Sequence, residues 1–196
     1  MHIGDGSNRL IYLKRMAEET EIPVKQVIPT HINRTKTVLE AGLEFAKLGG
    51  YVDMTTSSDP DFLEEDEVKA SHAIKFMLEN NIKPEQILCS SDGKGSMPIF
   101  NKKGELTGVG ICKCSSLYRE VRDAVLNDAV KFEHAIMTIT SNPADAYKLS
   151  NKGKIKEGFD ADLVILNKDN LLINDVLAKG KFVVKNCKNI IQGTFE

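Results

Sequence analysis

The sequence has no tryptophan, only six prolines, and four cysteines among 196 residues. Irregularly spaced cysteines in a chain of this length do not form a disulfide framework, so we expect a reducing, cytoplasmic location. No apolar run approaches the roughly 18 residues of a membrane span, and no signal-peptide core follows Met1. The chain also lacks excess positive charge: its formal net charge is −2. This balance argues against nucleic acid and acidic membrane surfaces as partners.

Helical and strand-like segments alternate along the first 150 residues. Apolar runs predict short strands at 24–28, 51–56 and 87–90. Apolar residues at helical spacing predict five helices, which begin near residues 7, 35, 64, 116 and 142. The acidic run at 64–67 would suit the positive end of the third helix dipole. This alternation predicts parallel βα units, in which the loops after the strands emerge on one face.

The pattern changes near residue 151, where short strands separated by turn residues replace the helices. Strand-like runs occupy 163–166, 176–178 and 182–184. The sequence therefore predicts two regions, an α/β region at 1–150 and a small β appendage at 151–196.

Three residues with ligand chemistry follow the expected strands. His2 and His31 come at the start of the chain and after the first predicted strand, and Asp92 follows the strand at 87–90. Two imidazoles and a carboxylate suit zinc, and neighbouring parallel strands would deliver them to one rim. Taken singly, each is more typical of an ordinary surface or capping residue, so only their shared position favours a metal site.

The stretch SSDGKGS at 90–96 raises a choice between a phosphate loop and a tight turn. It lacks the spacing of a Walker loop, so its glycines better fit a turn that leaves Asp92 as the reactive group. Ser96 offers a hydroxyl to a ligand. Arg34 can clamp a substrate carboxylate with two hydrogen bonds, although a surface ion pair is the commoner fate of an arginine.

Four segments carry a resemblance to a known family: HIGDG (2–6), PTHINR (29–34), SSDGKGS (90–96) and GFDADLVIL (158–166). Together they resemble the C-terminal half of isoaspartyl dipeptidases, metallopeptidases of the amidohydrolase superfamily. The last segment is typical of the whole superfamily. The combination of PTHINR with SSDGKGS is far narrower.

The resemblance implies the C-terminal half of a (β/α)₈ barrel, strands five to eight, followed by a small β domain. His2 and His31 would bind one zinc ion, and Asp92 would bind a second and act as the general base. Arg34 and Ser96 would bind polar groups of an isoaspartyl dipeptide. The implied reaction is hydrolysis of the β-carboxyl peptide bond by water that two zinc ions activate.

The family features that belong to the first half of the barrel are absent from the sequence. These are the His-x-His pair of strand one, the carboxylated lysine of strand four, and acidic and tyrosine substrate residues. We therefore expect a partial site that binds zinc weakly and does not turn over dipeptides alone. Either this chain is a truncated or separately expressed half, or another polypeptide supplies strands one to five. A reading frame that continues in phase upstream of Met1 and encodes His-x-His would settle the question. Open sheet edges also predict a homo-oligomer.

Three other functions remain open at this stage. Another amidohydrolase, such as a dihydroorotase or hydantoinase, would share the histidine and aspartate pattern, although the arginine of PTHINR favours the isoaspartyl enzyme. A non-catalytic half would serve assembly only. A nucleotide-binding module on SSDGKGS would respond to an ATP titration.

Overall fold

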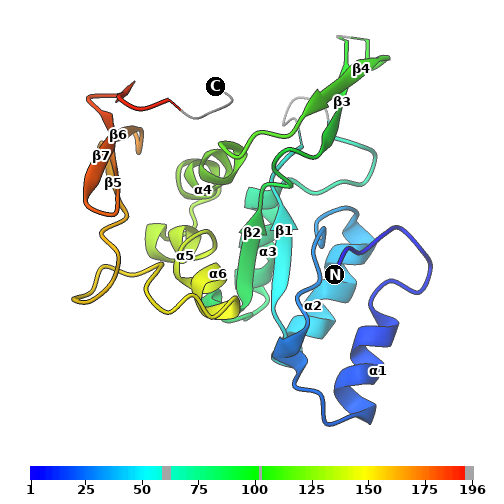
Figure 1. Cartoon of the computed structure of the whole chain (residues 1–196). Helices are drawn as coiled ribbons and strands as arrows, with labels where there is room; N and C mark the ends of the chain where they lie inside the picture. Colours follow the sequence, from blue (N-terminus) through cyan, green and yellow to red (C-terminus); the bar gives the residue numbers. More distant parts are fainter. Residues whose placement is uncertain (59–62, 102, 193–196) are drawn as a thin grey trace.

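The computed structural model describes residues 1–58, 63–101 and 103–192, and it is an α/β structure (Figure 1). The helices are α1 (Ile11–Glu19), α2 (Lys36–Lys47), α3 (Ala70–Glu79), α4 (Ser116–Leu126), α5 (Phe132–Met137) and α6 (Ser141–Ala146), with 3₁₀ turns η1 (Val24–Gln26) and η2 (Pro84–Gln86). The strands are β1 (Val52–Thr55), β2 (Ile87–Ser90), β3 (Ser96–Phe100), β4 (Leu106–Ile111), β5 (Leu163–Leu166), β6 (Ile173–Ala178), β7 (Lys181–Lys185) and β8 (Lys188–Asn189).

Strands β1 and β2 form a regular parallel pair, in which Val52 is opposite Ile87 and Thr55 is opposite Ser90. Both are almost fully buried, as expected for parallel strands covered by helices, although β1 also carries the polar residues Asp53 and Thr55. The predicted strand at 87–90 is confirmed to the residue, and that at 51–56 to within one residue at each end.

Two earlier segments extend this parallel arrangement through backbone hydrogen bonds that do not form a regular strand ladder. The amide of Asp53 donates to Pro29 O at 3.0 Å, and the amide of Ile32 donates to Asp53 O at 3.2 Å. On the other side, the amide of Thr30 donates to Met1 O at 2.8 Å, within a parallel bridge between residues 2 and 30. Residues 1–3, residues 28–32, β1 and β2 therefore lie side by side in chain order.

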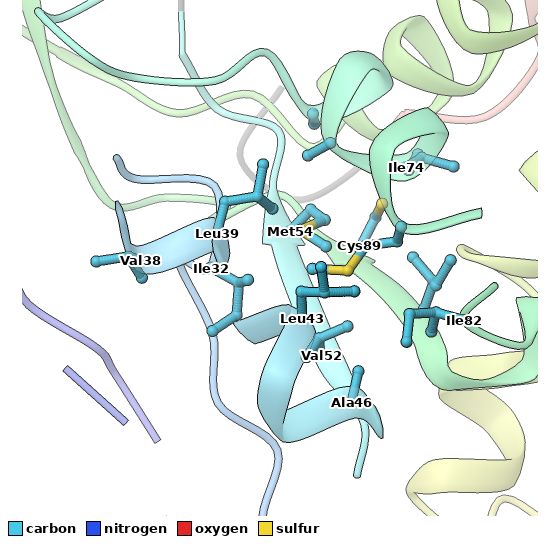
Figure 2. Close-up of a cluster of buried hydrophobic side chains, with 14 of the residues drawn as sticks. Ile32, Val38, Leu39, Leu43, Ala46, Val52, Met54, Ile74, Ile82 and Cys89 are labelled. Atoms are coloured by element: carbon cyan, nitrogen blue, oxygen red, sulfur yellow. The ribbon is translucent and has the colours of Figure 1, made fainter. Parts of the chain in front are cut away.

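Helix α2 covers these strands with one apolar face (Figure 2). Its buried residues recur at helical spacing and include Val38, Leu39, Leu43 and Ala46. The helix begins where the Thr35 hydroxyl accepts a hydrogen bond from the Val38 amide at 3.2 Å, an N-cap arrangement. Helix α3 contributes buried residues to the same core.

Close packing at Gly42 fixes how near α2 approaches the segment at 28–32. A Cβ atom at this position would lie 2.4 Å from Ile32 Cγ2. Only glycine leaves room for the isoleucine side chain, so this position couples the helix to the segment that carries His31.

Three of the expected elements differ from the structure. The first helix begins at Ile11 and not near residue 7, and Leu10 precedes it without a side-chain cap. The predicted strand at 24–28 begins as the turn η1, because the Gln26 amide bonds back to Pro23 O at 2.8 Å. The third helix begins at Ala70 and not at the acidic run. There the Glu67 carboxylate accepts from the Glu64 amide at 3.1 Å and from the Ser58 hydroxyl, and these bonds stabilise a turn.

Helix α5, the hairpin formed by β3 and β4, and the short strand β8 were not anticipated. The hairpin projects away from the helices (Figure 1). Its turn uses Gly104 in the left-handed region, with a φ of 77°. A glycine between two short apolar runs is a recognised hairpin signal, so the sequence contained this information.

The C-terminal residues form a four-stranded antiparallel sheet in the order β5-β6-β7-β8. The predicted strand at 163–166 matches β5 exactly in its bounds. The Tyr118 hydroxyl of α4 donates to Leu171 O at 2.6 Å and joins this sheet to the helices. All four cysteines are free thiols. Among the described residues, no helix combines the length and apolar character that crossing a membrane requires.

Candidate metal and substrate site

Two of the expected zinc ligands lie side by side at one end of the parallel segments. His2 Nδ1 is 2.8 Å from His31 Nε2, and the ring centroids are 4.8 Å apart. The two imidazoles come from residues 1–3 and 28–32, which are neighbours in the parallel arrangement. The strand order therefore explains how residues 29 positions apart in the sequence meet.

The backbone at His31 and at Asp92 adopts the left-handed conformation, with φ values of 65° and 48°. Such a conformation costs a non-glycine residue about 1 kcal/mol and is concentrated at functional sites. At His31 it inserts an extra residue, so that Ile32 bonds to Asp53 O where a regular parallel ladder would use residue 31.

The remaining nitrogen of His31 is held by β1. His31 Nδ1 lies 2.6 Å from Thr55 Oγ1 at the end of that strand. When the hydroxyl accepts from Nδ1–H, the lone pair of the imidazole is on Nε2, the atom that faces His2. Burial lowers the pKa of His31; the Asp92 carboxylate opposes this effect and nearby His2 and Arg34 add to it. A neutral imidazole is the form that binds metal.

Asn33 fixes Thr55 in turn through its buried side-chain amide. Its Nδ2 donates to Thr55 O at 3.0 Å and to Val68 O at 2.9 Å, and its Oδ1 accepts from the Thr55 amide at 2.8 Å. Both the amide nitrogen and the amide oxygen of this side chain have hydrogen-bond partners, and they hold the end of β1 against the segment before α3. We did not assign a role to Asn33 or Thr55 from the sequence.

A buried carboxylate joins three of the parallel segments beneath the histidines. Asp53 Oδ2 accepts a hydrogen bond from Ser90 Oγ at 2.6 Å and another from the Thr30 hydroxyl. Burial raises the pKa of Asp53, and the two hydroxyl donors oppose that shift. Because Thr30 precedes His31 in the chain, this network also anchors the segment that carries the imidazole.

Asp92 lies in the turn that follows β2. The Gly95 amide donates to Asp92 O at 2.9 Å, and a Cβ at Gly95 would come within 2.8 Å of that oxygen. At Gly93 a Cβ would be 2.6 Å from Cys114 Sγ. The glycines of SSDGKGS thus allow a tight, closely packed turn that carries the Asp92 carboxylate.

A cleft of about 260 Å³ contains His31 and the other expected site residues except His2. Its lining also includes an apolar wall from the hairpin strand β3. The lining residues are His31, Asn33, Arg34, Thr55, Ser57, Ser58, Glu64, Glu67, Asp92, Ser96, Met97, Pro98, Ile99, Phe100 and Cys112.

Arg34 is paired within the protein. Its Nε atom lies 2.9 Å from Asp5 Oδ1 and 3.1 Å from Oδ2, and both side chains are partly exposed. Exposed pairs of this kind contribute at most about 1 kcal/mol, so the pair can separate at low cost. Asp5 therefore competes with any carboxylate that Arg34 would bind, an interaction the sequence did not reveal.

Residues 10–195 match the profile of the amidohydrolase family. The chain belongs to the amidohydrolase family. This is a family of hydrolases, and its fold agrees with the α/β arrangement of the parallel segments and the helices that cover them. A dihydroorotase from Methanosphaera stadtmanae is 40% identical over 43 residues, which are 22% of this chain and 10% of that protein.

Two solved structures share the fold over almost the whole chain. A β-aspartyl dipeptidase from Fervidobacterium islandicum AW-1, in complex with the dipeptide β-Asp-Leu, gives a TM-score of 0.82 at 33% identity, covering 98% of this chain and 49% of that one. A second structure of the β-aspartyl dipeptidase from this organism gives 0.81 at 30% identity, covering 98% and 47%. The chain thus spans about half the length of these dipeptidases.

The donor set fits part of a zinc site in this amidohydrolase chain. His2 Nδ1 and His31 Nε2 face one another, and zinc binds imidazole nitrogen at about 2.0–2.1 Å. In the described ranges, no three histidine, cysteine, aspartate or glutamate side chains are close enough together to bind one ion. The imidazole pair therefore offers two ligands, and Asp92 does not complete a group of three with it.

Proposed function

We propose that residues 1–150 form the second half of an amidohydrolase barrel, strands five to eight, and that residues 151–196 form part of its small β domain. The side-by-side order of residues 1–3, residues 28–32, β1 and β2 supports this proposal. So does the TM-score of 0.82 over half of a β-aspartyl dipeptidase. In this arrangement an N-terminal half, supplied by the full-length protein, completes the barrel.

We propose further that the completed protein hydrolyses isoaspartyl dipeptides with zinc. The observation that carries this proposal is the pairing of His2 with His31 at a cleft that also holds Arg34, Asp92 and Ser96. These residue types can bind a metal, a carboxylate and a peptide group together. The likeness to a dipeptidase structure with β-Asp-Leu bound supports the choice of substrate.

In this mechanism His2 Nδ1 and His31 Nε2 would hold one zinc ion, and Asp92 would hold a second together with ligands from the first half. When bound, zinc would supply a lower pKa for water and a polarised scissile carbonyl. Asp92 takes the proton of the attacking water and gives it to the leaving amine as the β-carboxyl carbon–nitrogen bond breaks. The products are aspartate and the second amino acid.

Substrate binding in this scheme falls to Arg34 and Ser96. The Arg34 guanidinium separates from Asp5 and binds a dipeptide carboxylate, while the Ser96 hydroxyl donates a hydrogen bond to a second polar group. Thr55 keeps the His31 imidazole oriented throughout. The barrier is lowered mainly because the reacting groups are held in position before the reaction begins.

The test uses the zinc-loaded 196-residue chain and nuclear magnetic resonance titration with β-Asp-Leu, with α-Asp-Leu as the matched control. We expect weak binding of the β-linked dipeptide, weaker still in Arg34→Lys and tighter in Asp5→Asn, which frees the guanidinium. Equal binding of both dipeptides would contradict the proposed substrate. Turnover by the chain alone at a rate typical of an intact enzyme would contradict the need for a first half.

A dihydroorotase-like activity is the second candidate, because the 43-residue match to the Methanosphaera stadtmanae protein supports it. Dihydroorotate added to the same titration separates the two. Displacement of β-Asp-Leu by dihydroorotate at lower concentration would favour this second candidate.

A further inference from the structure

One wall of the candidate cleft is the hairpin strand β3, which lies along it. Every residue of this strand, Ser96–Phe100, lines the cleft. Of the described residues of β4, neither Val109 nor Ile111 is part of the lining. The side chain of Ile99 on β3 is open to a ligand, because this residue is 46% exposed. β3 therefore gives a largely apolar wall to a cleft whose other lining residues are mostly polar.

The start of β3 is bonded to the turn that carries Asp92. The Gly95 amide donates to Asp92 O at 2.9 Å, and the Cys112 amide donates to Gly95 O at 2.9 Å. The Lys94 amide donates to Cys112 O at 3.1 Å. These backbone hydrogen bonds hold the base of the hairpin and the Asp92 turn together, so the position of the apolar wall is fixed relative to Asp92.

The chemistry of the proposed function, on which this inference rests, places the second residue of the dipeptide beside this wall. In that function Asp92 gives a proton to the leaving amine. The leaving amine belongs to the residue that follows isoaspartate, and the side chain of that residue is attached one carbon away from the amine nitrogen. With this nitrogen at Asp92, the side chain comes within reach of the adjoining β3. An apolar side chain gains free energy when it leaves water for an apolar surface.

We propose that Met97, Ile99 and Phe100 of β3 form the subsite for the second residue of the dipeptide, and that this subsite selects large apolar side chains. Glu64 and Glu67 line the same cleft and disfavour an acidic second residue. Burying roughly half of a leucine side chain strengthens binding about fivefold or more. We expect β-Asp-Leu to bind more tightly by this factor than β-Asp-Gly. The same holds against β-Asp-Asn, whose side chain is close to leucine in size but polar.

Nuclear magnetic resonance titration of the zinc-loaded 196-residue chain with these three dipeptides tests the subsite. Ile99→Ala should reduce the preference for leucine to about twofold or less, and Met97→Ala should act in the same direction. Ile111→Ala is the matched control, because Ile111 is a 64% exposed isoleucine of the same hairpin outside the cleft lining. It should leave all three affinities unchanged. The amide signals of Gly108 and Gly110, which are opposite β3 residues, show whether the hairpin forms in each variant.

Failure of this subsite and failure of the proposed function give different results. Equal affinities for β-Asp-Leu and α-Asp-Leu would contradict the proposed function. A preference for the β-linked dipeptide, combined with equal affinities for the leucine, asparagine and glycine dipeptides, would agree with that function and overturn the subsite. A preference for leucine that survives in both Ile99→Ala and Met97→Ala, or that Ile111→Ala removes equally, would also overturn the subsite.

Discussion

Asn33 is the residue whose removal should disturb the site most clearly. Its side chain makes three hydrogen bonds of 2.8–3.0 Å, two to the backbone of Thr55 and one to Val68 O, and it is 2% exposed. Each such bond contributes about 1 kcal/mol net, so Asn33→Ala should lower the free energy of unfolding by about 3 kcal/mol. The partners left buried without water add to this loss.

Urea denaturation followed by circular dichroism measures the effect. With a slope of about 2 kcal/mol/M, a loss of about 3 kcal/mol moves the midpoint down by about 1.5 M. Asn127→Ala, which removes one exposed 3.4 Å contact at the end of α4, is the control and should change stability by less than about 0.5 kcal/mol. If Asn33→Ala loses less than about 1 kcal/mol, Asn33 does not hold the end of β1.

Three further predictions concern the same part of the molecule. Thr55→Val should reduce zinc affinity about tenfold by isothermal calorimetry, because His31 Nδ1 loses its partner; unchanged affinity would contradict that role. The pKa of Asp53 is raised in the folded state, so the folded protein keeps this proton at a pH where the unfolded chain has lost it. The free energy of unfolding should therefore fall as pH rises through the raised pKa. In metal-free urea titrations, the free energy of unfolding of Asp53→Asn should not fall with pH in this way. Curves of unfolding free energy against pH that run parallel in the wild type and the variant would refute the prediction. Ellman's reagent should modify Cys114 and Cys187 in the native protein and reach Cys89 and Cys112 only on unfolding, since both are buried and burial raises the pKa of Cys89.

The regular elements were predictable where the apolar pattern was strong. The runs at 87–90 and 163–166 match β2 and β5, and the periodicity after Thr35 matches α2, because each buries one continuous apolar face or run. The predicted start of the third helix at the acidic run 64–67 was wrong. Its carboxylates bond to nearby groups in a turn and do not cap a helix.

The sequence indicated that His2 and His31 would lie near one another, but it did not indicate how they are held. His2 and His31 meet because two segments run side by side, which the βα alternation indicated. The extra residue that His31 inserts, the Asn33 bonds to Thr55, and the Asp5–Arg34 pair depend on contacts between residues at least 21 positions apart. No local propensity encodes such contacts, so they required the folded structure.

Zinc binding by the 196-residue chain, measured by calorimetry on its histidine variants, tests the central claim most directly. The chain has four histidines, and His72 and His134 lie on α3 and α5 away from the cleft residues. We predict weak binding by the wild type, a loss of at least about tenfold in His2→Ala and in His31→Ala, and no change in His72→Ala or His134→Ala. Binding that survives in His2→Ala and His31→Ala, or that falls equally in all four variants, would contradict the account.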